Sequence, residues 1–99
     1  MATRHRPELS PNAVRIANWL VDKRAEFEER GISEDATIDA AGVEKAEART
    51  AIDQLENRET LVRDPEALTK PPRFVLKPGR NWPDTRDRLL GSRSASVSG

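Results

Sequence analysis

Apolar residues recur every three or four positions over the first sixty residues of the chain, a period that predicts amphipathic helices. The first helix is expected to cover residues 10–30 without a break. Ser10 is a good N-cap for it, and Pro11 fits the first helical position because its missing N–H would have no helical partner there. Gly31 then ends the helix, since glycine readily takes the conformation that follows a helical C-terminus.

The apolar arc of this first helix is unusually wide. Two apolar stripes run side by side along it, and Trp19 adds to them on one flank. This arc is wider than a small sheet and two helices usually cover, so two interpretations stay open. Either the core wraps the helix on two sides, or a homodimer contact covers Val14, Val21 and Trp19.

Two more helices are expected at residues 35–41 and 44–57, joined by a tight turn. Ser33 or Asp35 caps the shorter helix, and Gly42 supplies the turn residue that tolerates positive φ. In the longer helix the aliphatic residues fall on one face, and small and polar residues fall on the other. The exposed face is expected to carry Ala46, Arg49, Thr50, Asp53 and Asn57.

Two short strands are expected at residues 60–63 and 73–77, where large apolar residues alternate with polar ones. Residues 64–72, with the sequence DPEALTKPP, hold three prolines and are expected to form an irregular loop. A strand, a loop and a second strand in this order predict a β-hairpin with an extended tip.

The C-terminal part is expected to form a docking segment or short helix over residues 80–90, with Asp84 as its cap and Gly91 as its stop. Residues 91–99 are small and polar, which predicts a disordered tail. The docking segment is too apolar for a free tail, so it should cover the first helix or a second subunit. Its apolar residues are Trp82, Leu89 and Leu90.

The N-terminal residues 1–9 show no periodicity and contain Arg4 and Arg6. This basic arm is either a frayed terminus or an extension that reaches a DNA phosphate or minor groove. The single folded domain is therefore expected over residues 10–79.

The composition excludes several classes of function. The 99 residues include no cysteine, so disulfides, thiolate nucleophiles and Cys-based zinc sites are excluded, which fits the cytoplasm. The only histidine, His5, lies in the N-terminal arm outside the expected folded domain, so a Ser-His-Asp set is not expected. No apolar run approaches the ~20 residues that span a bilayer. We therefore expect a cytoplasmic protein that is not an enzyme, with no metal, no cofactor and no membrane partner.

The order of these elements resembles a winged-helix domain. The resemblance depends on the AAGV turn of residues 40–43, the apolar spacing of the helix that follows it, and the strand–loop–strand after that helix. It implies an α+β, mainly helical fold: a three-helix bundle with a helix-turn-helix, a two-stranded β-hairpin wing and a short C-terminal helix. Such domains often carry glycine between the recognition helix and the wing. Here Asn57 is expected to take the left-handed conformation in its place.

By this resemblance, the chain is a small regulator of transcription that binds duplex DNA as a homodimer. The helix 44–57 would read the major groove, and the wing 64–73 would meet the DNA backbone or minor groove. The implied DNA-binding residues are Lys45, Ala46, Arg49, Thr50 and Asn57 in the helix, with Lys70 and Arg73 in the wing.

The charge distribution supports this interpretation only in part. The whole chain is neutral, but residues 31–60 carry eight acidic and three basic residues, and residues 61–99 carry a net charge of +4. Glu44 and Glu47 lie in the first turn of the expected reading helix, where they would repel DNA phosphates. The alternative interpretation is a winged helix that contacts another protein and reads no DNA directly.

Overall fold

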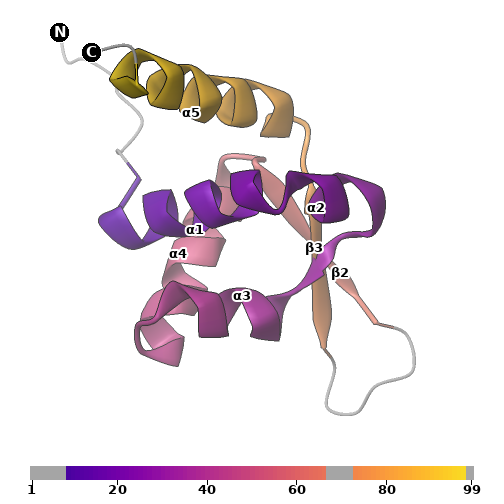
Figure 1. The fold of residues 1–99 in the computed structure, drawn as a ribbon. Coiled ribbons are helices and arrows are strands. Elements are labelled where there is room, and N and C mark those ends of the chain that lie inside the picture. Colours follow the sequence, from indigo (N-terminus) through magenta and orange to yellow (C-terminus); the bar gives the residue numbers. More distant parts are fainter. Residues whose placement is uncertain (1–8, 67–72, 98–99) are drawn as a thin grey trace, which may run out of the picture.

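The computed structural model describes residues 9–66 and 73–97 of the chain (Figure 1). Five helices and three short strands follow one another along these residues. They are α1 (Pro11–Asp22), α2 (Arg24–Arg30), β1 (Ile32–Ser33), α3 (Glu34–Ala41), α4 (Lys45–Asn57), β2 (Leu61–Pro65), β3 (Phe74–Pro78) and α5 (Trp82–Val97). Helices α1, α3 and α4 pack around one apolar core, the sheet closes its side, and α5 lies across the outside of α1 (Figure 1).

The prediction of one continuous helix over residues 10–30 is wrong, because the helix is interrupted at Lys23. Lys23 leaves the helical conformation (φ −103°, ψ 21°), and its N–H is shared between the carbonyls of Trp19 and Leu20. The Phe27 N–H still donates to the Lys23 carbonyl, so α2 follows α1 directly. Phe27 is completely buried in the core, as is Val21 at the end of α1. The wide apolar arc is explained mainly by packing on two sides, because α1 contacts α3 and α4 on one side and α5 on the other (Figure 1).

A third strand, which the alternation did not predict, follows the end of α2. Gly31 takes a positive φ of 84° there. Ile32 pairs with Leu76 in the antiparallel sheet, whose strand order is β1-β3-β2. A Cβ on Gly31 would lie 2.7 Å from Val75 Cγ1 and 2.8 Å from the Leu76 carbonyl oxygen. Glycine is therefore required at this position both by the backbone conformation and by the close approach of β3.

The expected turn between the second and third helices is confirmed. The Ser33 hydroxyl accepts the N–H of Ala36 at 3.1 Å and so caps α3. Gly42 adopts the left-handed conformation (φ 69°) between α3 and α4. The aliphatic face of α4 is buried as predicted. It consists of Ala48, Ala51, Ile52 and Leu55, each at most 1% exposed.

The left-handed residue after α4 is Glu59 (φ 61°), so the expectation for Asn57 is wrong. The Thr60 N–H donates to the Leu55 carbonyl and the Glu59 N–H to the Glu56 carbonyl, which is the Schellman pattern of a helix C-terminus. A Cβ on Gly79 would lie 2.3 Å from the Glu59 carbonyl oxygen. The chain after the hairpin therefore packs directly on this turn, and these contacts hold a non-glycine residue in a conformation that glycine favours.

The predicted hairpin is present. Strands β2 and β3 are antiparallel, with Arg63 opposite Leu76 and Pro65 opposite Phe74. Pro65 therefore extends β2 beyond the expected end of the strand, which is tolerated because β2 lies at the edge of the sheet. The tip of the hairpin, residues 67–72, lies outside the described residues.

Helix α5 differs from its prediction at both ends. It begins at Trp82, where the Thr85 N–H donates to the Asn81 carbonyl, so Asp84 lies inside the first turn and is not the cap. It also continues through Gly91 to Val97, so the predicted stop and the irregular tail from residue 91 are wrong for this part of the chain. No helix in the described part of the chain is long and apolar enough to cross a membrane.

Trp82 fixes the start of α5 on α2. The Trp82 ring is 2% exposed and meets the Phe27 ring edge to face, with centroids 4.7 Å apart. Its Nε1–H donates to Glu28 Oε2 at 2.6 Å, and Arg86 Nη1 donates to the same oxygen at 2.8 Å. The hydrogen bond from Trp82 first, and then that from Arg86, lowers the pKa of Glu28 from its ordinary value of 4.5.

This carboxylate should make the stability of the protein depend on pH. Since the pKa of Glu28 is lower in the folded state, its contribution is fully present above the unfolded-state pKa and is lost as the pH falls through the folded-state pKa. The free energy of unfolding of Glu28→Gln should thus approach that of wild type below that pKa and fall short of it at neutral pH. Urea unfolding across this pH range measures the difference. The adjacent, exposed Glu29→Gln serves as the control, and an equal pH dependence of both gaps would contradict the prediction.

Candidate nucleic-acid interface

The residues of α4 that were predicted to contact DNA lie on its outer face and are exposed to solvent. These residues are Lys45, Ala46, Arg49, Thr50 and Asn57. The Thr50 hydroxyl donates to the Ala46 carbonyl at 3.0 Å, which fixes its rotamer and leaves its oxygen free to accept. The buried face of α4 anchors the helix from behind, because it packs on α1 and α3. The five residues therefore share the solvent-facing side of one helix whose other side is packed in the core.

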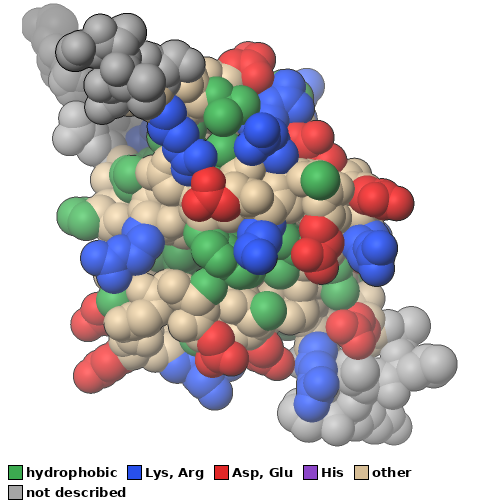
Figure 2. All heavy atoms as spheres, in the orientation of Figure 1, with side chains coloured by type: hydrophobic (Ala, Val, Ile, Leu, Met, Phe, Trp, Pro, Cys, Tyr) green, Lys and Arg blue, Asp and Glu red, His purple; other side chains and the backbone are tan. Residues whose placement is uncertain are grey.

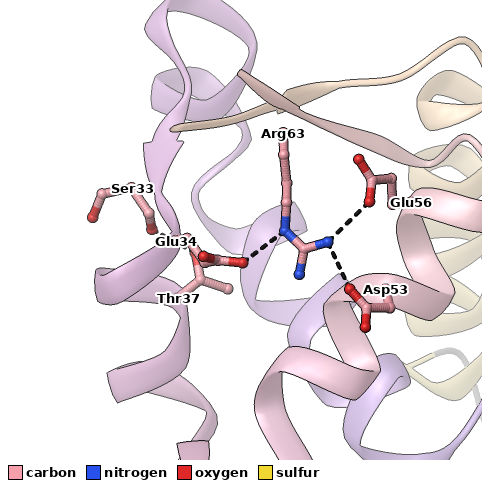
Figure 3. A network of polar contacts seen from close by, with 6 residues as sticks. All are labelled: Ser33, Glu34, Thr37, Asp53, Glu56 and Arg63. Atoms are coloured by element: carbon pink, nitrogen blue, oxygen red, sulfur yellow. Dashed lines mark hydrogen bonds and ion pairs between the residues drawn. The ribbon is translucent and has the colours of Figure 1, made fainter. Parts of the chain in front are cut away.

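Arg63, on strand β2 of the hairpin, forms hydrogen bonds to both α3 and α4 (Figure 3). Its Nε donates to Glu34 Oε2 at 2.7 Å, at the start of α3. Its Nη1 donates to Asp53 Oδ1 at 2.6 Å and to Glu56 Oε1 at 2.9 Å, both on α4. The side chains of Arg63 and Glu34 are only 16% and 11% exposed. This four-residue group, called the Arg63 network below, sets the position of β2 relative to α3 and α4.

The hydrogen bonds of the Arg63 network change the pKa of Arg63 itself. Burial alone would lower the pKa of Arg63, but the hydrogen bonds to Glu34 and Asp53 outweigh it and raise that pKa above its ordinary value. Arg63 is therefore permanently charged, and it partly neutralises three carboxylates that would otherwise face solvent or the protein interior.

The Arg63 network determines which partner Asp53 has. Asp53 lies four residues after Arg49 on α4, a spacing at which opposite charges usually pair. Here Asp53 is bound to Arg63 instead. No hydrogen bond or ion pair joins the Arg49 side chain to another of the described residues, so this guanidinium is available to an external anion.

Exposed acidic side chains lie on the same helix as Arg49 and on the helix before it. Glu44 and Glu47 in the first turn of α4 are exposed, and so are Asp35 and Asp39 on α3. Figure 2 shows acidic side chains along the lower edge of the molecule, over α3 and the start of α4. The carboxylates of Glu44 and Glu47 would therefore repel the phosphates of any DNA that reaches α4, as the sequence predicted.

The wing and the arm are described only in part. Arg73 lies exposed just before β3, where its carbonyl accepts the Glu66 N–H. Lys77 pairs with Asp64 across the hairpin, so this cation is already engaged. The predicted wing contact Lys70 and the arm residues Arg4 and Arg6 lie outside the described residues.

The predicted dimer residues divide into two groups. Val21 (0% exposed) and Trp82 (2% exposed) are buried in the core of a single chain, so the expectation that they contact a second subunit is wrong. Val21 is buried because other elements cover α1 on two sides, and Trp82 is buried because α5 begins against α2. Val14 is 38% exposed, and the other members of the set are partly buried. The residues that stay accessible are Val14, Trp19, Leu89 and Leu90.

Two features of this surface were missed by sequence reasoning. The first is the Arg63 network, whose members are spread over residues 34–63 and meet only in the folded chain. A weak signal existed, because Arg63 occupies a strand position directly after an acidic segment. The second is an open cavity of about 700 Å³ between α1, the turn after α4 and the start of α5, for which the sequence carries no pattern.

One solved structure resembles this fold along most of the chain. It is the transcriptional regulator Tm0710 from Thermotoga maritima, with a TM-score of 0.66 and 17% sequence identity. The alignment covers 91% of this chain and 58% of that one, so the chain spans less than two thirds of the regulator's length. No protein-family model and no curated protein matches the sequence. The helix-turn-helix of α3 and α4, the hairpin and this likeness establish the predicted winged-helix fold.

Proposed function

We propose that this protein regulates transcription by binding duplex DNA, with α4 in the major groove and the hairpin against the backbone. The observation that carries the proposal is the outer face of α4, where Arg49 lies exposed and unpaired on a helix anchored from behind. A guanidinium in this position can bind the O6 and N7 atoms of a guanine with two hydrogen bonds. The similarity to a transcriptional regulator supports the same role. In this proposal the protein acts in the cytoplasm by binding rather than by catalysis, without a cofactor.

The other residues of the outer face fit supporting roles. Ala46 lies one turn before Thr50 and can touch a thymine methyl group, while Lys45 can reach a phosphate. Thr50 and Asn57 can accept or donate hydrogen bonds at base edges or phosphates. Phosphate contacts supply most of the affinity of DNA-binding proteins, so Arg73, Lys70 and the basic arm are assigned that part.

The acidic residues near α4 set a limit on this affinity. Glu44 and Glu47 stabilise the helix through its dipole but repel phosphates, so one domain should bind DNA weakly. Specific binding would then require two copies on a palindromic site. We propose a homodimer for this reason, formed through the accessible apolar residues around Val14 on α1 and Leu89 and Leu90 on α5.

Arg49→Gln should weaken binding to the preferred site by about 5- to 150-fold, because a bidentate base contact is worth about 1–3 kcal/mol. The site is first obtained by selection from a random duplex pool. Fluorescence anisotropy then compares wild type and variant at several salt concentrations. Arg30→Gln, which removes an exposed arginine on the distant helix α2, should change the affinity less than about twofold. An equal loss in both variants would contradict base reading by Arg49.

The homodimer is tested separately. Light scattering of the purified chain should give twice the mass of one copy, and the selected DNA should be palindromic. Val14→Asp should return the protein to a monomer without unfolding it, because this side chain is 38% exposed. A monomer at high protein concentration, with an asymmetric selected site, would exclude the homodimer while leaving DNA binding in place.

A second candidate function is supported by the acidic surface of α3 and α4. The exposed residues Asp35, Asp39, Glu44 and Glu47 would suit a partner protein with a basic surface. This alternative predicts no enrichment of any sequence from the random pool and no DNA binding at low salt. Steeply salt-dependent DNA binding that needs Arg49 would exclude it.

A further inference from the structure

A cavity lies between α1, the turn after α4 and the first half of α5. It is open to solvent and measures about 700 Å³. Leu9, Val14 and Leu89 form an apolar part of its wall, and polar groups of Thr60, Asn81 and Thr85 form another. The lining holds four apolar and six polar or charged residues, so a ligand that fits it has an apolar part and a polar or charged part.

Two arginines in this wall are unpaired. No hydrogen bond or ion pair joins the side chains of Arg58 and Arg88 to another of the described residues. Other arginines nearby are engaged, since Arg86 binds Glu28 and Arg93 binds Asp22. One carboxylate, that of Asp84, also lines the cavity. The wall therefore carries a net charge of +1, next to apolar side chains that solvent can reach.

We propose that this cavity binds a small monoanion with an apolar body, such as a medium-chain or aromatic carboxylate. The two guanidinium groups match a carboxylate, to which arginine donates paired, charge-assisted hydrogen bonds. Leu9, Val14 and Leu89 would cover the apolar body, whose removal from water favours binding. Because Val14 and Leu89 are also assigned to the proposed homodimer contact, the ligand would bind the single chain and compete with that contact. A nucleic-acid backbone does not fit this wall as well, because the apolar residues have no counterpart in a phosphate chain.

The position of the cavity gives such a ligand a structural effect. Arg58 is the C-cap residue of α4, and Arg88 lies on α5. An anion held by both arginines ties the end of α4 to α5 across the cavity, near the Glu59 turn. If α4 reads DNA as proposed above, the ligand would change that affinity; the binding itself does not depend on the proposed function.

Ligand binding is tested without DNA, by titrating the ¹⁵N-labelled full chain with octanoate and with 2-naphthoate. At least one of them should shift the amide signals of Thr60, Asn81 and Thr85 in a saturable way. The matched neutral compounds octanamide and 2-naphthamide, and acetate as an anion without an apolar body, should bind at least tenfold more weakly. Lack of saturable shifts at these residues with both carboxylates, or equal binding of the neutral amides, would overturn the proposal.

Variants of the two arginines test whether their charges are needed for ligand binding. Arg88→Gln alone should reduce the affinity at least threefold, and Arg58→Gln with Arg88→Gln should reduce it at least tenfold. Arg30→Gln, on helix α2 and away from the lining residues, is the matched control and should leave it unchanged. Thermal unfolding verifies that each variant is folded. Unchanged affinity in the folded double variant would overturn the proposal, whatever the result of the DNA measurements.

Discussion

Trp82→Ala is expected to destabilise the protein by about 3–5 kcal/mol, the usual cost of truncating a buried tryptophan. The Trp82 ring is 2% exposed, packs edge to face on Phe27, and donates a hydrogen bond to Glu28. Its loss leaves a cavity between α2 and α5 and removes one of the two donors to the Glu28 carboxylate. A domain of this size has a total stability of only about 5–15 kcal/mol, so this variant should be close to unfolding.

Urea unfolding followed by circular dichroism measures this effect. Trp82→Phe is the matched variant, because it keeps an aromatic ring beside Phe27 while it removes the Nε1–H donor and the second ring of the indole. It should lose less than half of what Trp82→Ala loses. Leu90→Ala, which truncates a partly buried residue of the same helix, should have a smaller effect still. Similar stability of Trp82→Ala and wild type would show that α5 is not part of the cooperative fold.

Arg63→Met is expected to cost about 2–4 kcal/mol of stability and to weaken DNA binding at least tenfold. Removal of one partner from a buried ion pair leaves an unpaired charge inside the protein, which typically costs 3–5 kcal/mol. Glu34 would be that charge, because its side chain is 11% exposed. We expect the lower value because Asp53 and Glu56 are 58% and 39% exposed and are screened by water.

The loss of DNA affinity follows from the same geometry. Without Arg63, Asp53 is free to pair with Arg49, and Glu56 adds an unpaired negative charge beside α4 (Figure 3). Both changes disfavour a polyanion. Binding is measured below the unfolding temperature of the variant, so that a loss of fold cannot imitate a loss of affinity.

Lys77→Met is the matched control for Arg63→Met. It breaks an ion pair in the same hairpin, but Lys77 and Asp64 are 45% and 49% exposed. Such pairs contribute about 0–1 kcal/mol, so the stability should change little. Glu34→Gln combined with Arg63→Met should recover part of the lost stability, since it removes the buried charge. If the single and double variants were equally unstable, the burial of Glu34 would not be the cause.

The helix-turn-helix was predicted correctly because its signals are local. Ser33 caps α3, Gly42 makes the left-handed turn, and the period of the aliphatic residues decides which face of α4 is buried. Each of these depends on residues within a few positions of one another. The DNA-contact candidates on α4 could be predicted from the same period, because the residues of a helix that do not face the core face solvent.

Other parts of the fold could not be predicted in this way. Lys23 is neither glycine nor proline, yet the helix is interrupted there, and nothing in the local sequence marks the interruption. Gly91 has the local character of a helix stop, yet α5 continues through it, with Arg93 bound to Asp22 and to the Asn18 carbonyl of α1. At Gly91 these tertiary contacts outweigh the unfavourable helix propensity of glycine, which is about 1 kcal/mol.

The sequence by itself determined the N-cap at Ser10, the turn at Gly42, the hairpin and the buried face of α4, because these depend on backbone preferences and periodicity. The tertiary structure alone decided the break at Lys23, the strand β1 and the partner of Asp53. It also decided that Arg49, Arg58 and Arg88 stay unpaired while Arg63 does not. The physical reason is that charge pairing and burial depend on distances between residues far apart in the chain, which exist only after folding.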